Sequence, residues 1–342
     1  MNPIAPVLDA LSADIARLSA DLGRRVDVAS LNATDRRGHL ALGAPGLQSP
    51  NGACRLVRAA DGWIAVNLAR EEDQDLVPAW LRCDFGDGPW ASIAALVPTR
   101  PWTELVADAA LLGLPVAGVG EVTCDSLEPP LLNLGAGASA PRRGPLKVVD
   151  LSALWAGPLC GTILAEMGAS VVKVESVRRP DPTRTTTPEF FRRLNGAKSD
   201  LRLDMTQPDG QARLRDAILA ADVLITSARP RAFPPLGLSP EDVFAANPGL
   251  VWVAITGYGW TGQAASRVAF GDDAAAAGGL VRWSRTGAPR FMGDALADPI
   301  TGLAAAVGAL RGLSSGGGVL VDAALARCAA GAAAALRSPA AA

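Results

Sequence analysis

The stretch that most constrains the fold runs from Leu146 to Glu175 and contains two apolar runs with a helical segment between them. Lys147–Leu151 is short and mostly apolar, as is typical of a strand buried on both faces. Gly157 and Pro158 then begin a helix, because proline suits the first helical turn, where its missing N–H would be unpaired anyway. Val171–Glu175 is the second apolar run. The stretch therefore predicts a βαβ unit with a right-handed crossover.

The turn inside this unit lacks the glycine fingerprint of dinucleotide-binding proteins. Between strand and helix the sequence reads Ser152-Ala-Leu-Trp-Ala-Gly157, with one glycine where the fingerprint has three. Those glycines let the backbone approach a bound pyrophosphate closely. The sequence therefore argues against NAD as a cofactor.

Charge and cysteine usage exclude several classes of protein. The formal net charge is −2 and no long run of Lys or Arg occurs, so we expect neither a nucleic acid nor a membrane as partner. The five cysteines are scattered without a CxxC, which argues against a zinc site and against a disulfide framework. No signal-peptide pattern and no membrane-spanning run is recognised. We expect a cytoplasmic protein without a metal.

The chain divides into two predicted domains. Residues 1–128 are predicted to form a small α+β domain that begins with an amphipathic helix over 7–24. It contains a β-hairpin at Asp61-Gly62 and helices around 71–81 and 103–112, the last with Thr103 as a plausible cap. Residues 129–145, rich in Gly, Ala, Pro and Arg, indicate a linker. Residues 146–342 continue the α/β alternation and predict a Rossmann-like parallel sheet with helices on both faces.

Two features of the first domain stay open. His39 is the only histidine and has no carboxylate or serine motif beside it, so we interpret it as an ordinary loop residue. The stretch from Gly43 to Gly52 is rich in glycine and proline, and it is either a plain connector or a mobile lid.

Six strings between residues 146 and 328 resemble the family III CoA-transferases, a family that includes formyl-CoA transferase, carnitine CoA-transferase and α-methylacyl-CoA racemase. They are VVDLSALWAGP, GASVVKVE with Asp181 and Arg184 behind it, Leu194-Asn195-Gly-Ala-Lys198, ADVLI followed by Arg229-Pro230, LGLSPEDVFAANPGLVWVAITGYG, and GDALADPITGLAAAVGAL. They occur in the family's order. The resemblance implies coenzyme A as a substrate and an interlocked homodimer.

The first third of the chain also resembles this family, but out of order. The run from Gly46 to Gly52, the hairpin with Asp61-Gly62-Trp63, and Leu112-Gly-Leu-Pro115 are similar to the family's small domain, which usually follows the catalytic domain. A circular permutation explains this order, since it preserves core contacts and changes only loop closure. A fragment of a longer fused protein is the alternative.

The resemblance implies Asp298 as the nucleophile, in Asp298-Pro-Ile-Thr301-Gly302 just before a helix predicted over 302–310. Attack of a carboxylate on a thioester gives a mixed anhydride, which is reactive enough to return its acyl group to CoA. Asp294 is the rival, as a simple turn carboxylate. Asp298 is also a possible N-cap, a role compatible with catalysis because a helix N-terminus offers backbone donors to an oxyanion.

The resemblance also implies the residues that contact the substrates. For CoA they are Leu154, Trp155, Ala156, Lys198, Arg229 and, more weakly, Arg184. Two roles stay open for Lys198: it either contacts a phosphate of CoA or is a solvated surface lysine. Ser176 and Ser199 stand where the family often has basic residues. Either the affinity for CoA is reduced, or Arg178 and Arg179 supply the missing positive charge. Gly46 and Gln48 are the implied contacts of the loop that covers the acyl group.

The predicted function is transfer of CoA between an acyl-CoA and a carboxylic acid through an aspartyl anhydride. Racemisation of a 2-methylacyl-CoA is a second possibility and needs two acid-base groups. In the family's racemases these are a histidine and an aspartate, and the histidine is missing from the corresponding stretch Val268–Asp273. A non-catalytic CoA-binding protein is the third.

Overall fold

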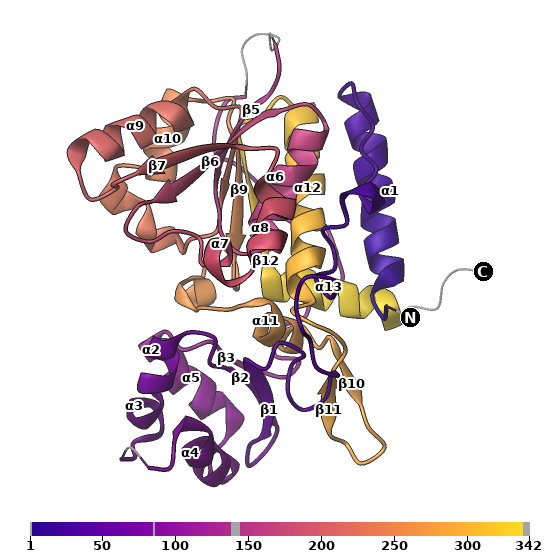
Figure 1. Ribbon diagram of the computed structural model, residues 1–342, viewed down its shortest axis with the longest axis vertical. Helices are drawn as coiled ribbons and strands as arrows, with labels where there is room; N and C mark the ends of the chain where they lie inside the picture. The colour runs from indigo at the N-terminus through magenta and orange to yellow at the C-terminus, as the bar shows by residue number, and fades with distance from the viewer. Residues whose placement is uncertain (1, 85, 138–143, 338–342) are drawn as a thin grey trace.

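A computed structural model describes residues 2–84, 86–137 and 144–337. The chain forms a large lobe, drawn above, and a smaller lobe below it (Figure 1). In the described part no helix is both long and apolar enough to cross a membrane.

The large lobe is built on a seven-stranded sheet, counted over the described residues. In spatial order its strands are β4 (Leu131–Asn133), β12 (Val319–Ala324), β9 (Val251–Thr256), β8 (Val223–Thr226), β5 (Lys147–Leu151), β6 (Ser170–Ser176) and β7 (Ser199–Leu203). All neighbours pair in parallel except β4 with β12. Read from β7 to β12, the order is that of the doubly wound nucleotide-binding fold, whose winding reverses between β5 and β8. The predicted fold class is confirmed.

Helices cover both faces of this sheet because its strands are apolar on both sides, as Val148 and Val149 of β5 show by entering opposite cores. On one face α6 (Ala156–Glu166), α12 (Ala297–Ser314) and α13 (Leu325–Arg337) pack against the strands. Outside them, α1 (Ala5–Asp21), α8 (Pro188–Asn195) and α11 (Gly271–Ala277) join the same apolar core. The other packs against α9 (Pro208–Leu219) and α10 (Pro240–Ala246). The short α7 (Thr183–Thr186) precedes α8.

The small lobe combines an antiparallel sheet with four helices, again counted over described residues. The sheet contains β1 (Cys54–Arg58), β2 (Trp63–Asn67) and β3 (Val116–Gly118), and the helices are α2 (Glu71–Asp75), α3 (Val77–Leu81), α4 (Pro89–Leu96) and α5 (Trp102–Leu112). The predicted hairpin at Asp61-Gly62 is confirmed, because β1 and β2 pair on either side of it. The prediction of Thr103 as a cap is wrong: α5 begins one residue earlier, and the Asp61 carboxylate accepts the Trp102 N–H at 2.8 Å.

Two segments that precede residue 146 in the chain pack with the large lobe. Helix α1 lies along α12 of the large lobe, and its Leu11 and Ile15 are buried there (Figure 1). The predicted linker 129–145 contains β4, which extends the large sheet; residues 138–143 of that linker lie outside the described part. The hairpin of β10 (Val281–Trp283) and β11 (Pro289–Phe291) lies beside the small lobe (Figure 1).

Short 3-10 turns complete the connections. They lie at Ala29–Leu31, Val97–Thr99, Pro230–Ala232, Pro234–Leu236 and Gln263–Ser266.

Candidate active site

The turn after β5 lies where the winding of the sheet reverses, which is the usual place for a ligand in an open α/β sheet. Its Ala153 amide donates to Ser227 Oγ, just after β8, at 2.9 Å. Leu154 has a backbone φ of +69°, a left-handed conformation that residues other than glycine rarely adopt. Its amide is held by a hydrogen bond of 3.1 Å to Asp181 Oδ2. The tertiary structure therefore imposes the shape of this turn.

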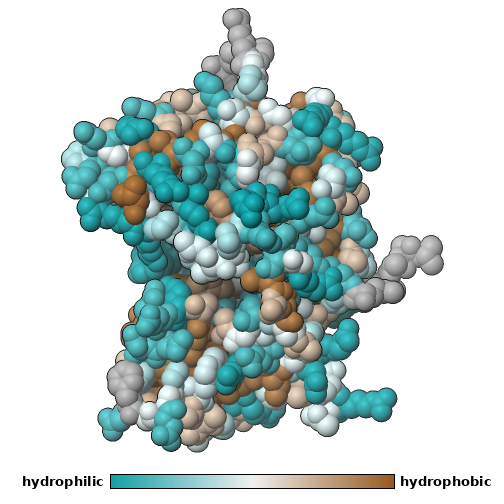
Figure 2. Space-filling view, viewed as in Figure 1, coloured by the Kyte–Doolittle hydropathy of each residue, from teal (hydrophilic) through white to brown (hydrophobic). Residues whose placement is uncertain are grey.

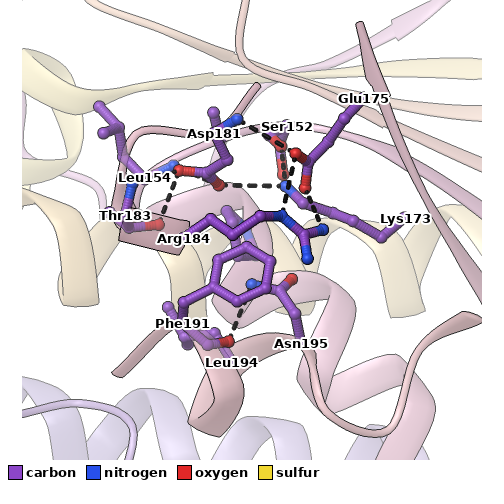
Figure 3. A network of polar contacts seen from close by, with 12 residues as sticks. Ser152, Leu154, Lys173, Glu175, Asp181, Thr183, Arg184, Phe191, Leu194 and Asn195 are labelled. Atoms are coloured by element: carbon purple, nitrogen blue, oxygen red, sulfur yellow. Dashed lines mark hydrogen bonds and ion pairs between the residues drawn. The ribbon is translucent and has the colours of Figure 1, made fainter. Parts of the chain in front are cut away.

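A buried polar network holds the backbone of this turn in place (Figure 3). The Lys173 ammonium donates to the Ser152 carbonyl and lies 3.2 Å from Asp181 Oδ2. Asp181 Oδ1 accepts from the amide and the hydroxyl of Thr183, at 3.1 and 2.6 Å. The Lys173 side chain is only 1% exposed, so breaking this ion pair would leave an uncompensated buried charge. The network thereby fixes the backbone around Leu154.

Lys198 is also buried, with 1% of its side chain exposed. Its ammonium donates to Asp150 Oδ2 at 2.7 Å, the Pro158 carbonyl at 2.8 Å and Asn195 Oδ1 at 2.9 Å. An ammonium has three protons, and these contacts use all of them. Lys198 is therefore not the solvated lysine of the open alternative, and in this structure its protons are directed to protein oxygens.

Arg184 is held in the same way (Figure 3). Its guanidinium contacts Glu175 Oε1 at 2.9 Å and Asp200 Oδ1 at 2.8 Å, and it lies 4.3 Å above the Phe191 ring. These contacts tie α7 to β6 and β7.

Arg229 is the predicted CoA contact whose charge is least neutralised. It follows β8, is half-buried, and donates to the Ser266 carbonyl at 3.3 Å. Burial and the neighbouring charges of Arg231, Arg70 and Arg179 lower the pKa of Arg229. These four residues form an arginine patch. Within the described residues, no ion pair engages Arg179, Arg229 or Arg231.

The arginine patch draws its residues from both lobes. Arg70 lies at the start of α2 in the small lobe, and Arg179 and Arg229 belong to the large lobe. Figure 2 shows a notch between the lobes on the side of α2. Arg70 is paired with Asp73, whereas Arg179, Arg229 and Arg231 have no carboxylate partner among the described residues. Cations of this kind attract phosphate groups.

Asp298 lies in the first turn of α12, not ahead of the helix. The helix begins at Ala297 rather than near residue 302, and its N-cap position is Leu296, so the N-cap interpretation of Asp298 is wrong. A Cβ on Gly271 would lie 2.2 Å from Asp298 Oδ2, so a larger residue at position 271 would displace the carboxylate. The Ala156 amide, in the first turn of α6, faces the same carboxylate and favours its charged form.

Four further polar side chains surround Asp298, and together the five form the acidic cluster: Arg36, Asn51, Asp272, Asp294 and Asp298. Arg36 holds Asp294 with two parallel hydrogen bonds, Nε to Oδ2 at 2.5 Å and an Nη to Oδ1 at 3.0 Å. Asn51 donates to both Asp272 and Asp294. Asp294 is thus engaged in an ion pair, which favours Asp298 as the reactive carboxylate.

Burial and like charge act in the same direction on Asp298. Burial raises its pKa to about 7; Arg36 opposes this, while Asp272 and Asp294 add to it. Burial likewise raises the pKa of Asp272 to about 6. Both protonation states of Asp298 are therefore accessible near neutral pH.

A cavity of about 530 Å³ adjoins the acidic cluster, with Arg36 and Asp294 in its wall. Trp155 forms another part of the wall, and Arg36 lies 5.0 Å above its ring. The indole N–H of Trp155 donates to the Ala33 carbonyl at 2.8 Å, and its ring meets Phe190 edge-on. Trp155 therefore shapes the cavity from a buried position.

The loop 43–52 borders the same cavity through Gly43, Pro45 and Pro50, but its predicted contacts Gly46 and Gln48 are not in the cavity wall. The Gly46 carbonyl accepts from the Phe291 amide at 2.8 Å, and Gln48 is exposed with its side chain donating to the Gly52 carbonyl at 3.1 Å. His39 lies on the preceding segment, 5.6 Å from the Phe190 ring. Asn51 is the residue of this loop that reaches the acidic cluster.

Sequence reasoning missed Arg36, Asn51 and Asp272 as site residues. Arg36 and Asp294 are 258 positions apart, and Asn51 and Asp272 are 221 apart. No local spacing could reveal such pairs. Among the described residues, no group of three or more His, Cys, Asp or Glu side chains is arranged to hold a metal ion.

Residues 145–337 match the model of CoA-transferase family III. Over 190 residues the chain is 32% identical to succinyl-CoA–D-citramalate CoA-transferase of Chloroflexus aurantiacus, with 52% of this chain and 47% of that protein covered. It is 30% identical to human succinyl-CoA:glutarate CoA-transferase, with 52% and 43% covered. The chain thus spans about half the length of the curated relatives that it matches.

Two solved structures are also similar. A CAIB/BAIF family protein from Brucella suis is 31% identical to this chain, with a TM-score of 0.50. The match covers 54% of this chain and 53% of the Brucella chain. A hypothetical protein from Mycobacterium tuberculosis is 29% identical, with a TM-score of 0.51. That match covers 54% of this chain and 56% of the Mycobacterium chain. The permuted order of the small domain stays a prediction.

The pKa of Asp298 predicts how pH acts on stability. An aspartate titrates near ~3.9 in an unfolded chain, but at about 7 in this fold. Because the folded pKa is the higher, the stability that Asp298 contributes is complete below ~pH 4 and is lost as the pH rises through 7. At ~pH 8 we expect Asp298→Asn to exceed the wild type in free energy of unfolding by on the order of 1–3 kcal/mol, with little difference at ~pH 4. Urea unfolding at both pH values measures this; equal stability at the higher pH would contradict the raised pKa.

Proposed function

The chain belongs to CoA-transferase family III, and from this premise we propose that it moves CoA between an acyl-CoA thioester and a carboxylic acid, with Asp298 as the nucleophile. The observation that carries the proposal is the state of Asp298. It is the half-buried carboxylate of the acidic cluster that faces a helix N-terminus, while Asp294 is held by Arg36. The names of the relatives make succinyl-CoA the first donor to test.

The proposed reaction begins with attack of ionised Asp298 on the thioester carbonyl. The C–S bond breaks, CoA leaves as a thiolate, and a mixed acyl–aspartyl anhydride remains. The thiolate then attacks the aspartyl carbonyl, which releases the first carboxylate and leaves an aspartyl-CoA thioester. A second carboxylic acid, as its anion, reverses both steps and takes the CoA. No proton is gained or lost over the cycle.

The first turn of α6 supports these steps. The Ala156 amide points at the carboxylate of Asp298 and favours negative charge there. We propose that the same donor stabilises the oxyanion that forms on the aspartyl carbon when the thiolate, and later the second carboxylate, attacks it. Burial of the site strengthens that interaction because water is largely excluded.

We propose that CoA extends from Asp298 across the turn after β5 toward the arginine patch. In this proposal Leu154 and Ala156 contact CoA through the turn, and Arg229 contributes a charge that no ion pair engages among the described residues. Gly46 and Gln48 are proposed to move toward the acyl group when substrate binds. Lys198 and Arg184 are proposed to act by holding the turn and α7 in place, since their donors contact protein oxygens.

The catalytic role predicts a selective loss on substitution. Asp298→Asn keeps the size of the side chain, so folding and CoA binding should persist while transfer falls by on the order of 10³-fold or more. Transfer is followed as the appearance of a new acyl-CoA by chromatography. Asp294→Asn is the matched control and should be much milder. Near-normal turnover by Asp298→Asn would exclude the proposed mechanism.

The arginine patch predicts the effect on CoA affinity. Replacing Arg229 by alanine should weaken CoA binding by about 1–3 kcal/mol, the usual range for a charge-assisted contact. Arg285→Ala, an exposed arginine in the turn between β10 and β11, should leave it unchanged. Titration calorimetry compares the two variants. An unaltered affinity in Arg229→Ala removes that residue from the proposed site.

We further propose a homodimer, as the family resemblance implies. Leu111 on α5 is 86% exposed and Trp283 on β10 is 54% exposed, which leaves large apolar side chains on the surface for a second copy to cover. Light scattering at micromolar concentration should give twice the mass of the 35.0 kDa chain. A monomeric mass would contradict this assembly.

A further inference from the structure

We propose that Asn51 is a positioning residue for Asp298: its amide clamps Asp272 and Asp294 as a fixed pair of carboxylates beside the reactive one. Asn51 Nδ2 donates to Asp272 Oδ2 at 2.6 Å and to Asp294 Oδ1 at 2.8 Å. The importance of this clamp for catalysis rests on the proposed role of Asp298.

The orientation of the Asn51 amide is determined by its other contacts. Its oxygen accepts from Ser49 Oγ at 3.0 Å and from the Ala53 amide at 2.9 Å. Turning the amide over would set that oxygen against two carboxylates and its nitrogen against the Ala53 donor. Both protons of the nitrogen and both lone pairs of the oxygen therefore have partners in one orientation.

The clamp joins three separate elements at the cluster. Asn51 belongs to the loop 43–52, Asp272 to the first turn of α11, and Asp294 to the turn before α12. Asp272 Oδ1 also accepts the Ala295 amide at 2.7 Å, and Asp294 is held by Arg36. Displacing Asn51 would therefore leave each carboxylate with one remaining anchor.

Two carboxylates that share one donor repel each other, and a donor between them is what allows both to stay charged. The Asn51 hydrogen bond favours the charged form of Asp272, and the charges of Asp272 and Asp294 in turn act on Asp298. Arg36 acts on Asp298 with the opposite sign, and Cys54 and Asp273 are the other titratable neighbours of Asp272. Removing the clamp should let Asp272 take up a proton, and the pKa of Asp298 should then fall.

The neighbouring aspartate supplies a matched control. Asn67 donates to Asp273 Oδ1 at 2.8 Å, and the Phe270 amide donates to the same oxygen at 2.9 Å. This pair also joins the small lobe to α11, and both side chains are buried. Asn67→Ser should therefore disturb the contact between the lobes as much as Asn51→Ser, without touching Asp272 or Asp294.

The test is the titration of Asp298 itself, followed by ¹³C NMR of aspartate carboxyl groups in the whole chain. The Asp298 signal is identified as the one lost in Asp298→Asn. In Asn51→Ala and Asn51→Ser the midpoint should fall by about 1 pH unit, while in Asn67→Ser it should stay at the wild-type value. Serine keeps an oxygen that can accept the Ala53 amide, so this variant serves if alanine prevents folding.

A wild-type midpoint in folded Asn51→Ser would overturn the clamp, as would an equal shift in Asn67→Ser. Neither measurement requires an acyl-CoA. If Asp298→Asn retained full transfer activity, the proposed function would fail while the NMR result still decided whether Asn51 controls the charge on Asp298.

Discussion

The close approach of α6 and α12 is the constraint on which the candidate site depends. A Cβ on Gly302 would lie 2.8 Å from the Ala156 carbonyl and from Leu159, so the two helices reach this separation only because position 302 is glycine. The same approach brings the first turns of both helices together, and with them the Ala156 amide and the Asp298 carboxylate. Gly271 leaves the space that this carboxylate fills.

Charge is divided between two ends of the site. The arginine patch holds positive charge from both lobes, and the acidic cluster holds three carboxylates beside the cavity. The buried pairs of Lys173 with Asp181 and Lys198 with Asp150 hold the backbone around the turn after β5. A network of this kind keeps the backbone rigid where a ligand with phosphates at one end and a reactive carbonyl at the other would lie.

The sequence alone predicted the architecture well because period, turn chemistry and strand length are local signals. The βαβ unit, the hairpin at Asp61-Gly62 and the parallel sheet followed from them. The start of α12 was misplaced because Pro299 and the residues around it lack a side-chain cap to mark the boundary. Arg36, Asn51 and Asp272 could not be predicted, since only the tertiary fold brings residues more than 200 positions apart into contact.

The central claim, a covalent intermediate on Asp298, is tested most directly by trapping. An acyl-CoA that the protein consumes is incubated with it and hydroxylamine, and the peptides are then mapped by mass spectrometry. Attack of hydroxylamine on an activated aspartyl carbonyl leaves a hydroxamate on that side chain. The proposed mechanism predicts this modification at Asp298, dependent on the acyl-CoA. Consumption of the acyl-CoA with Asp298 unmodified, or with the hydroxamate on another carboxylate, would contradict it.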